Sequence, residues 1–306
     1  MIAKSSLVAA LLASALISAP AAAQAISNEI VSAKGTLTAD QRKAVAEDLD
    51  ARAAKFADAD PAEVVAMRNE MVALLRNPIT AIPFRREFGA EFARAFQRFA
   101  DSKDAMRAAN AFIVARHVKT EKGVDFIADN LDADSQPDAS IRIAASSQLP
   151  KAIDEAPLSP PQLDALAKRV ATTCRKETDW VVASHEVDAI TEILRTEQLP
   201  AAQSDAIAMS LAGTINDLAA RTLDGSQPQL VNALQRALLA VRNQLSNVAA
   251  SSRGKLLTAI TPTLDKLSAM KGKAPEALSG ADLAETFDAV VNTCGLLKKV
   301  RATGDK

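Results

Sequence analysis

The chain has 306 residues, and its 36 Lys and Arg residues nearly cancel its 37 Asp and Glu residues, leaving a net charge of −1. This balance gives no support to nucleic-acid binding, which depends on clustered positive charge. Hydrophobic residues make up 48% of the chain but aromatic residues only 3%. Ala, Leu, Val and Ile therefore carry the hydrophobicity, a mixture that favours closely packed helices and offers little material for a sheet.

The first 25 residues are typical of a cleavable secretory signal peptide. Lys4 supplies a positive charge, residues 7–17 form an apolar segment too short to cross a bilayer, and the run from Ala21 to Ala25 contains two A-x-A cleavage sites. We expect cleavage after Ala23 or Ala25 and a periplasmic or secreted product. Nothing downstream approaches the roughly 18 continuous apolar residues of a membrane span, so we expect no transmembrane segment in the mature chain.

From residue 38 onward the apolar residues repeat at helical spacing. Val64, Met67, Met71 and Leu74, for example, draw one stripe along a helix. Capping-box patterns such as Thr38-Ala39-Asp40-Gln41 mark the helix starts. Counting from these starts predicts about twelve helices joined by short loops, over residues 38–57, 61–76, 83–100, 103–117, 120–131, 138–152, 160–174, 177–195, 201–223, 227–248, 251–270 and 280–300.

Prolines fall mostly at the junctions between these segments. Pro262 is the exception, because it interrupts the apolar series of the helix expected over 251–270. A proline inside a helix removes one backbone hydrogen bond and clashes with the preceding turn. We therefore expect Pro262 to kink or split that helix.

Taken in pairs, the predicted helices form units of roughly 38 to 50 residues, a period that indicates an α-solenoid. The segment 137–149 resembles the inner-helix signature of HEAT repeats, and 104–109 is a weaker copy. The resemblance rests on Asp138, the Ile141-Arg142 pair, the Ala144-Ala145 pair and Leu149. It implies that Asp138 and Arg142 belong to a hydrogen-bonded ladder between repeats, and it implies a binding scaffold without chemistry of its own.

We therefore expect an all-α chain with one domain over residues 26–306, a stack of about six antiparallel helix pairs of the HEAT or armadillo kind. The HEAT-like signature fades beyond residue 200. An irregular helical bundle over 201–306 stays open as an alternative.

The only two cysteines, Cys174 and Cys294, lie on apolar helical seams. We expect two buried thiols that act as small hydrophobes. A disulfide between them is the alternative, and it would require the C-terminal half to curl back, because a bridge needs Cα atoms within about 7 Å.

No pattern of residues predicts a catalytic, cofactor or metal site. His117 ends a helix, where a cation suits the exposed carbonyl groups. His185 has no second histidine at four-residue spacing and so no zinc pair. Trp180 heads an apolar series and is expected in the core.

One helix stands out as a candidate interaction surface. Five phenylalanines at positions 84, 88, 92, 96 and 99 form the only aromatic stripe, and four arginines flank it: Arg85, Arg86, Arg94 and Arg98. A basic, aromatic helix suits an anionic membrane surface or the groove of a partner protein. The alternative is that the phenylalanines pack between helices while the arginines are solvated.

These observations favour a non-enzymatic scaffold of the bacterial cell envelope that binds a protein or a peptide and uses no cofactor. Two alternatives remain open. The helices could close into a compact bundle around a lipid or another small hydrophobic ligand, or the chain could be an enzyme whose carboxylate site the pattern does not reveal.

Overall fold

The computed structural model describes residues 26–196, 199–244 and 248–304, and the expected signal peptide at 1–25 lies outside these residues. All regular structure in the described ranges is helical, and they contain no strand. Among these helices, none is both long and apolar enough to span a membrane. The α-helices are α1 (Asn28–Val31), α2 (Ala39–Asp58), α3 (Pro61–Arg76), α4 (Ile82–Ala100), α5 (Ala105–Val118), α6 (Glu121–Ala128), α7 (Ala139–Glu155), α8 (Pro160–Lys176), α9 (Trp180–Leu194), α10 (Ala201–Leu223), α11 (Val231–Gln244), α12 (Ala250–Ser268) and α13 (Ala281–Gly304).

Local capping chemistry sets several of these boundaries. At the start of α2 the Thr38 hydroxyl accepts from the Gln41 N–H, and the Gln41 side chain accepts from the Thr38 N–H at 2.9 Å. Asp60 and Glu63 form the same reciprocal pair at the start of α3. Each pair satisfies amide groups that the first helical turn leaves without partners.

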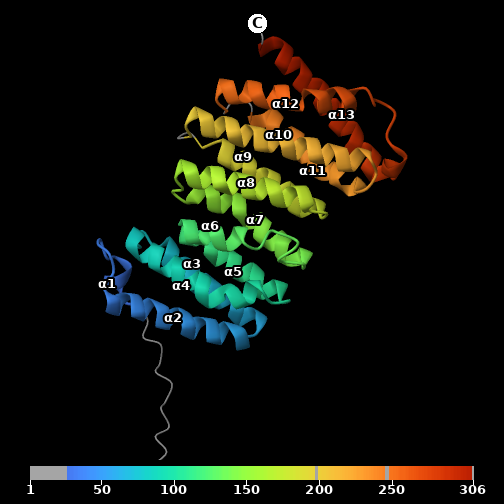
Figure 1. Cartoon of the computed structure of the whole chain (residues 1–306). Coiled ribbons are helices and arrows are strands. Elements are labelled where there is room, and N and C mark those ends of the chain that lie inside the picture. The colour runs from blue at the N-terminus through green and yellow to red at the C-terminus, as the bar shows by residue number, and fades with distance from the viewer. Residues whose placement is uncertain (1–25, 197–198, 245–247, 305–306) are drawn as a thin grey trace, which may run out of the picture.

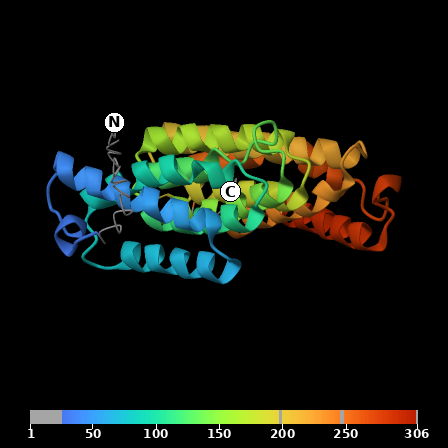
Figure 2. The same ribbon diagram turned by 90° about the horizontal axis from the view of Figure 1, so that it is seen from below.

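The helices stack in two layers. In one layer each of α3, α5, α7, α9, α11 and α13 contacts the next, and in the other α2 contacts α4, α8 contacts α10, and α10 contacts α12. Consecutive helices such as α4 and α5, or α8 and α9, pack between the layers. Figure 1 shows the resulting stack from α2 at one end to α12 and α13 at the other, and Figure 2 shows that later helices are displaced progressively to one side.

Arginines join helices at their ends, both between the two layers and within one layer. Arg107 on α5 donates to the Phe56 carbonyl at 3.0 Å and to the Ala59 carbonyl at 2.7 Å, at the end of α2. Arg221 on α10 donates to the carbonyls of Cys174 and Glu177 at 3.0 and 2.7 Å, at the end of α8. The last carbonyl groups of a helix lack partners within the helix, and a guanidinium group with five donors can satisfy several of them.

The aromatic stripe of α4 belongs to the core. All five of its phenylalanines are buried, and neighbouring rings contact one another; the rings of Phe92 and Phe96 are stacked, with centroids 4.3 Å apart. The stripe therefore holds α4 against its neighbours and is not available to a partner.

The structure corrects two expectations about single residues. Of the two outcomes expected at Pro262, the split helix is wrong, because α12 runs through it; Pro262 and Thr258 are both exposed, so water can satisfy the Thr258 carbonyl that the proline leaves free. Trp180 is 41% exposed, because it is the first residue of α9 and directly follows the capping Asp179. Cys174 and Cys294 are both buried and unbridged, as expected.

Candidate binding groove

The layer that contains α2, α4, α6 and α8 is interrupted between α6 and α8. These two helices barely touch, whereas α4 contacts α6 closely and α8 contacts α10 closely. The short helix α6 is pressed against α4 and α5 at two glycines. A Cβ atom at Gly123 on α6 would lie 2.4 Å from the Ala115 carbonyl oxygen of α5, and one at Gly89 on α4 would lie 3.0 Å from Oγ1 of Thr120, the residue directly before α6. α6 therefore packs closely against α4 and α5, and a groove separates its opposite side from α8.

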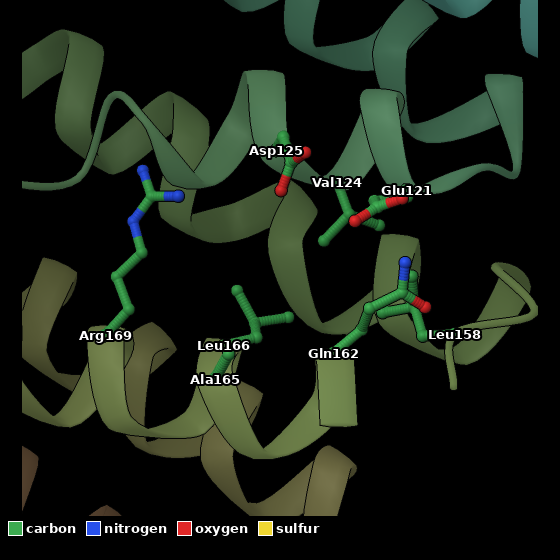
Figure 3. Close-up of a pocket in the computed structure, with 8 residues that line it drawn as sticks. All are labelled: Glu121, Val124, Asp125, Leu158, Gln162, Ala165, Leu166 and Arg169. Carbon is green, nitrogen blue, oxygen red and sulfur yellow. The ribbon is translucent and has the colours of Figure 1, made fainter. Parts of the chain in front are cut away.

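The inner part of this groove is a hollow of about 150 Å³ between α6 and α8. Figure 3 shows Glu121 and Asp125 extending from α6 toward Gln162 and Arg169 on α8, with Val124 and Leu166 between them. Arg169 forms an ion pair with Asp129 at the end of α6. Burial raises the pKa of Asp125 above its ordinary value.

The outer part of the groove is a larger hollow of about 430 Å³ at the edge where α4, α6 and α8 begin. We call it the basic hollow. It shares Glu121 and Gln162 with the inner part. Its lining residues are Ile82, Arg85, Arg86, Lys119, Thr120, Glu121, Lys122, Pro157 and Gln162. Four of these carry positive charge and one carries negative charge, a local excess in a chain that is nearly neutral as a whole.

Arg85 adds positive charge to the basic hollow but has a structural task. Its guanidinium donates to the backbone carbonyls of Leu75, Thr80 and His117, and so joins α3, α4 and α5. Burial lowers its pKa, and the negative charge of Glu155 partly opposes this effect. No carboxylate pairs with it within the described residues, so its charge contributes to the field of the hollow.

Lys119 closes α5 in the left-handed conformation, with φ 57° and ψ 43°. It is the only residue other than glycine with positive φ in the described ranges. Its ammonium group lies 3.2 Å from Glu155 Oε2, and Arg116 donates to Glu155 Oε1 at 2.9 Å. Burial pushes the pKa of Glu155 upward, but the hydrogen bonds from Arg116 and Lys119 outweigh it and hold the pKa below its ordinary value.

Arg86 differs from the other cations of the basic hollow. It is exposed, and the described part of the chain provides it with no hydrogen bond or ion pair. Lys122 lies 3.7 Å from Asp125 at the closest approach of their charged atoms. Beside Arg86 at the start of α4 lies Ile82, an isoleucine that is 60% exposed. The rim of the hollow thus offers an uncommitted guanidinium next to an apolar contact.

The four arginines singled out from the sequence lie in different places. Arg85 and Arg86 line the basic hollow. Arg94 pairs with Asp50 at 2.8 Å and Glu91 at 2.7 Å. Arg98 donates to a carbonyl of α2 and lies over the ring of Phe99, 4.8 Å from its centroid. The structure therefore brings two of the four to one site and uses the other two to attach α4 to its surroundings.

The two residues expected in a ladder between repeats also have defined partners. Asp138 caps α7 by accepting from the Ser140 N–H at 2.8 Å. Arg142 makes a buried ion pair with Glu177, which follows α8, with Nε–Oε2 and Nη2–Oε1 distances of 2.7 and 3.0 Å. Arg142 therefore links α7 to the segment between α8 and α9, through Glu177 and not through Asp138.

A buried acid lies near this ion pair, away from the groove. Glu186 on α9 is completely buried; Thr173 donates to its Oε1 at 2.7 Å, and its Oε2 has no hydrogen-bond partner. Burial raises its pKa to about 8, and the nearby charge of Glu177 adds to this effect. The carboxyl group is therefore protonated at neutral pH.

The protonation state of His117, at the end of α5, also differs from the expectation. His117 is buried, and burial lowers its pKa to about 4, helped by the positive charges of Arg116, Arg76 and Lys119. The imidazole is therefore neutral at pH 7. The expectation of a cationic histidine at this helix end is wrong, because burial disfavours the charged imidazole and the neighbouring basic residues add to this effect.

Sequence reasoning missed Ile82, Lys119, Lys122 and Gln162 as members of the site. For Lys119 and Lys122 the available signal was the density of basic residues between positions 116 and 122, where the shortest predicted helix begins; the sequence offers no such signal for Ile82 and Gln162. No family model matches the chain, and comparisons with curated proteins and with solved structures also return no match.

Proposed function

We propose that this chain is a non-enzymatic scaffold of the bacterial cell envelope that binds a protein or a peptide. In this proposal the two layers form a HEAT-like α-solenoid of six antiparallel helix pairs, which holds the groove between α6 and α8 in a fixed shape. The carrying observation is the basic hollow, where Arg86 is exposed and uncommitted beside Ile82. Interfaces of this kind combine an arginine with an apolar anchor.

The stacking pattern supports a scaffold in particular. From α2 to α13, helices two positions apart along the chain pack together except at α6 and α8, so the groove is a gap between neighbouring units and not a feature of a single loop. Repeat stacks derive their stability from such nearest-neighbour contacts and present extended surfaces to partners.

A photo-crosslinking amino acid placed in the full-length chain in bacterial cells tests this function. We expect position 82, at the rim of the groove, to give covalent adducts with a second protein after illumination. The matched control is position 209 on α10, where Met209 is also apolar and 48% exposed. Equal adducts at both positions, or none at position 82, would contradict the proposal.

Export is tested separately. N-terminal sequencing of the protein recovered from the periplasm or the medium should begin at Gln24 or Ile26, the residues after the two expected cleavage sites. A protein that retains residues 1–23 in the cytoplasm would remove the envelope from the proposal and leave the groove as it is.

A further inference from the structure

The charges of the basic hollow are only partly neutralised by the protein itself. Arg85 is satisfied by carbonyl groups alone, and Lys119 shares Glu155 with Arg116. Lys122 has a carboxylate no closer than 3.7 Å, and Arg86 has none. Positive charge left over in a hollow lowers the free energy of a negatively charged ligand there.

The backbone adds to this field. α4, α6 and α8 all begin at the basic hollow, which is lined by Ile82 and Gln162 from the first turns of α4 and α8 and by Thr120 directly before α6. Neither Ala81 before α4 nor Thr120 before α6 caps its helix with a side-chain hydrogen bond. The start of an α-helix carries partial positive charge on its amide groups, so the uncapped starts of α4 and α6 reinforce the side chains.

Lys119 points to a role beyond folding. A residue in the left-handed conformation at the end of a helix is usually glycine, because a side chain there costs roughly 1–2 kcal/mol. This chain instead places a lysine there, with its ammonium group in the lining of the basic hollow. Conformational strain retained at a site is commonly associated with function.

The shape and the apolar rim of the groove favour one kind of negatively charged partner, an extended peptide, over a flat bilayer surface. The site is a hollow that continues between α6 and α8 into the inner part, where Val124, Ala165 and Leu166 add apolar surface. A recess of this kind fits an extended chain with alternating charged and apolar side chains better than it fits a flat bilayer surface. Ile82 and Leu166 would receive apolar side chains, and Arg86 and Lys122 would receive carboxylates.

We propose that the groove between α6 and α8 binds an extended acidic peptide segment, whose carboxylates pair with Arg86 and Lys122 and whose apolar side chains lie on Ile82 and in the inner hollow. This proposal rests on the proposed binding function and specifies the chemistry of the partner. The inner hollow also contains Glu121 and Asp125, so the carboxylates of the peptide belong at the basic end.

Fluorescence anisotropy with short labelled peptides tests this chemistry on the mature protein. One peptide set alternates Asp or Glu with Leu, and a matched set carries Asn or Gln in place of the acids. We expect the acidic set to bind, the amide set to bind at least about tenfold more weakly, and the affinity for the acidic set to fall as the salt concentration rises.

Charge reversal at Arg86 identifies the site. Arg86→Glu should weaken acidic-peptide binding by about tenfold or more, since it removes one attraction and adds one repulsion. The control Lys271→Glu makes the same change in net charge at an exposed position between α12 and α13 and should change the affinity by less than about twofold. Circular dichroism of both variants checks that they fold.

The possible results separate this proposal from the function on which it rests. Equal affinity for the acidic and amide peptides would overturn the acidic chemistry and leave a peptide-binding groove. Binding of vesicles that contain phosphatidylglycerol, lost in Arg86→Glu and without peptide binding, would overturn the peptide and assign the site to a membrane surface. Failure of both peptide sets, with adducts at position 82 in cells, would overturn the peptide proposal alone; failure without adducts would overturn both.

Discussion

Replacing Glu186 with glutamine should remove a specific pH dependence from the stability of the protein. Glu186 is completely buried on α9, with one oxygen bonded to Thr173 and the other without a partner. Its pKa is raised from 4.5 to about 8, first by burial and then by the charge of Glu177. An unfolded chain exposes the same carboxyl group to water, where its pKa is ordinary.

The sign and the size of the effect follow from this difference. Below about pH 4.5 the carboxyl is protonated in both states, so its contribution to stability is fully present. As the pH rises toward 8 the unfolded state loses its proton first, and the free energy of unfolding falls. At about 1.36 kcal/mol per pKa unit, the loss reaches roughly 3 kcal/mol at pH 7 and roughly 5 kcal/mol above pH 8.

The measurement is urea unfolding of the wild type and Glu186→Gln at several pH values between 5 and 9, followed by circular dichroism. Glutamine keeps an oxygen for Thr173 and does not ionise. We expect the difference in unfolding free energy between the two proteins to move in favour of the variant by about 3 kcal/mol or more between pH 5 and pH 8. Glu285→Gln, at an exposed position on α13, is the control and should show no such trend.

A difference between the wild type and Glu186→Gln that stays constant across this pH range would refute the reasoning. It would mean that Glu186 ionises normally in the folded protein, and hence that the carboxyl group is hydrated or paired with a cation.

Three further predictions concern other positions. Lys119→Gly should stabilise the protein by about 1 kcal/mol by relieving the left-handed strain while weakening acidic-peptide binding; a loss of stability in urea unfolding would contradict this. Arg142→Met should cost about 3–5 kcal/mol because it leaves Glu177 buried and unpaired; the double variant with Glu177→Gln should recover part of that loss, and an equal or larger loss would count against the buried pair. Cys174 and Cys294 are buried, which raises the pKa of Cys294 to about 12 and the pKa of Cys174 well above its ordinary value; neither should react with Ellman's reagent until urea unfolds the chain, and rapid reaction of the native protein would show that they are accessible.

The helix positions could be predicted from the sequence because local chemistry determines them. Thr38, Asp60 and Ser159 each start a helix with a partner three residues further on, and the structure has α2, α3 and α8 at these places. Apolar spacing then gave the approximate extent of most helices, although α6 and α11 are shorter than the expected 120–131 and 227–248, and α1 was not predicted. Capping patterns and apolar spacing act within one or two helical turns, so they can be recognised without knowledge of the tertiary structure.

The groove could not be predicted in the same way, because it depends on contacts between helices. It exists where Gly89 and Gly123 seat α6 against α4 and α5, and no local pattern shows which helix a glycine faces. Arg85 and Arg86 are neighbours in sequence, yet the guanidinium of Arg85 is bonded to four backbone carbonyl groups and that of Arg86 has no partner within the described residues. Contacts between helices decide which charged side chain is bonded within the protein and which remains available to a ligand.

Solution scattering on residues 26–306 tests the open stack on which the groove depends. A compact domain of this length has a radius of gyration near ~19 Å. Two layers of helices stacked in a row predict a clearly larger radius for the monomer and a pair-distance distribution with a long tail, with circular dichroism confirming the helix content. A radius at the compact value with a symmetric distribution would contradict the open stack, and with it a groove presented by an extended scaffold.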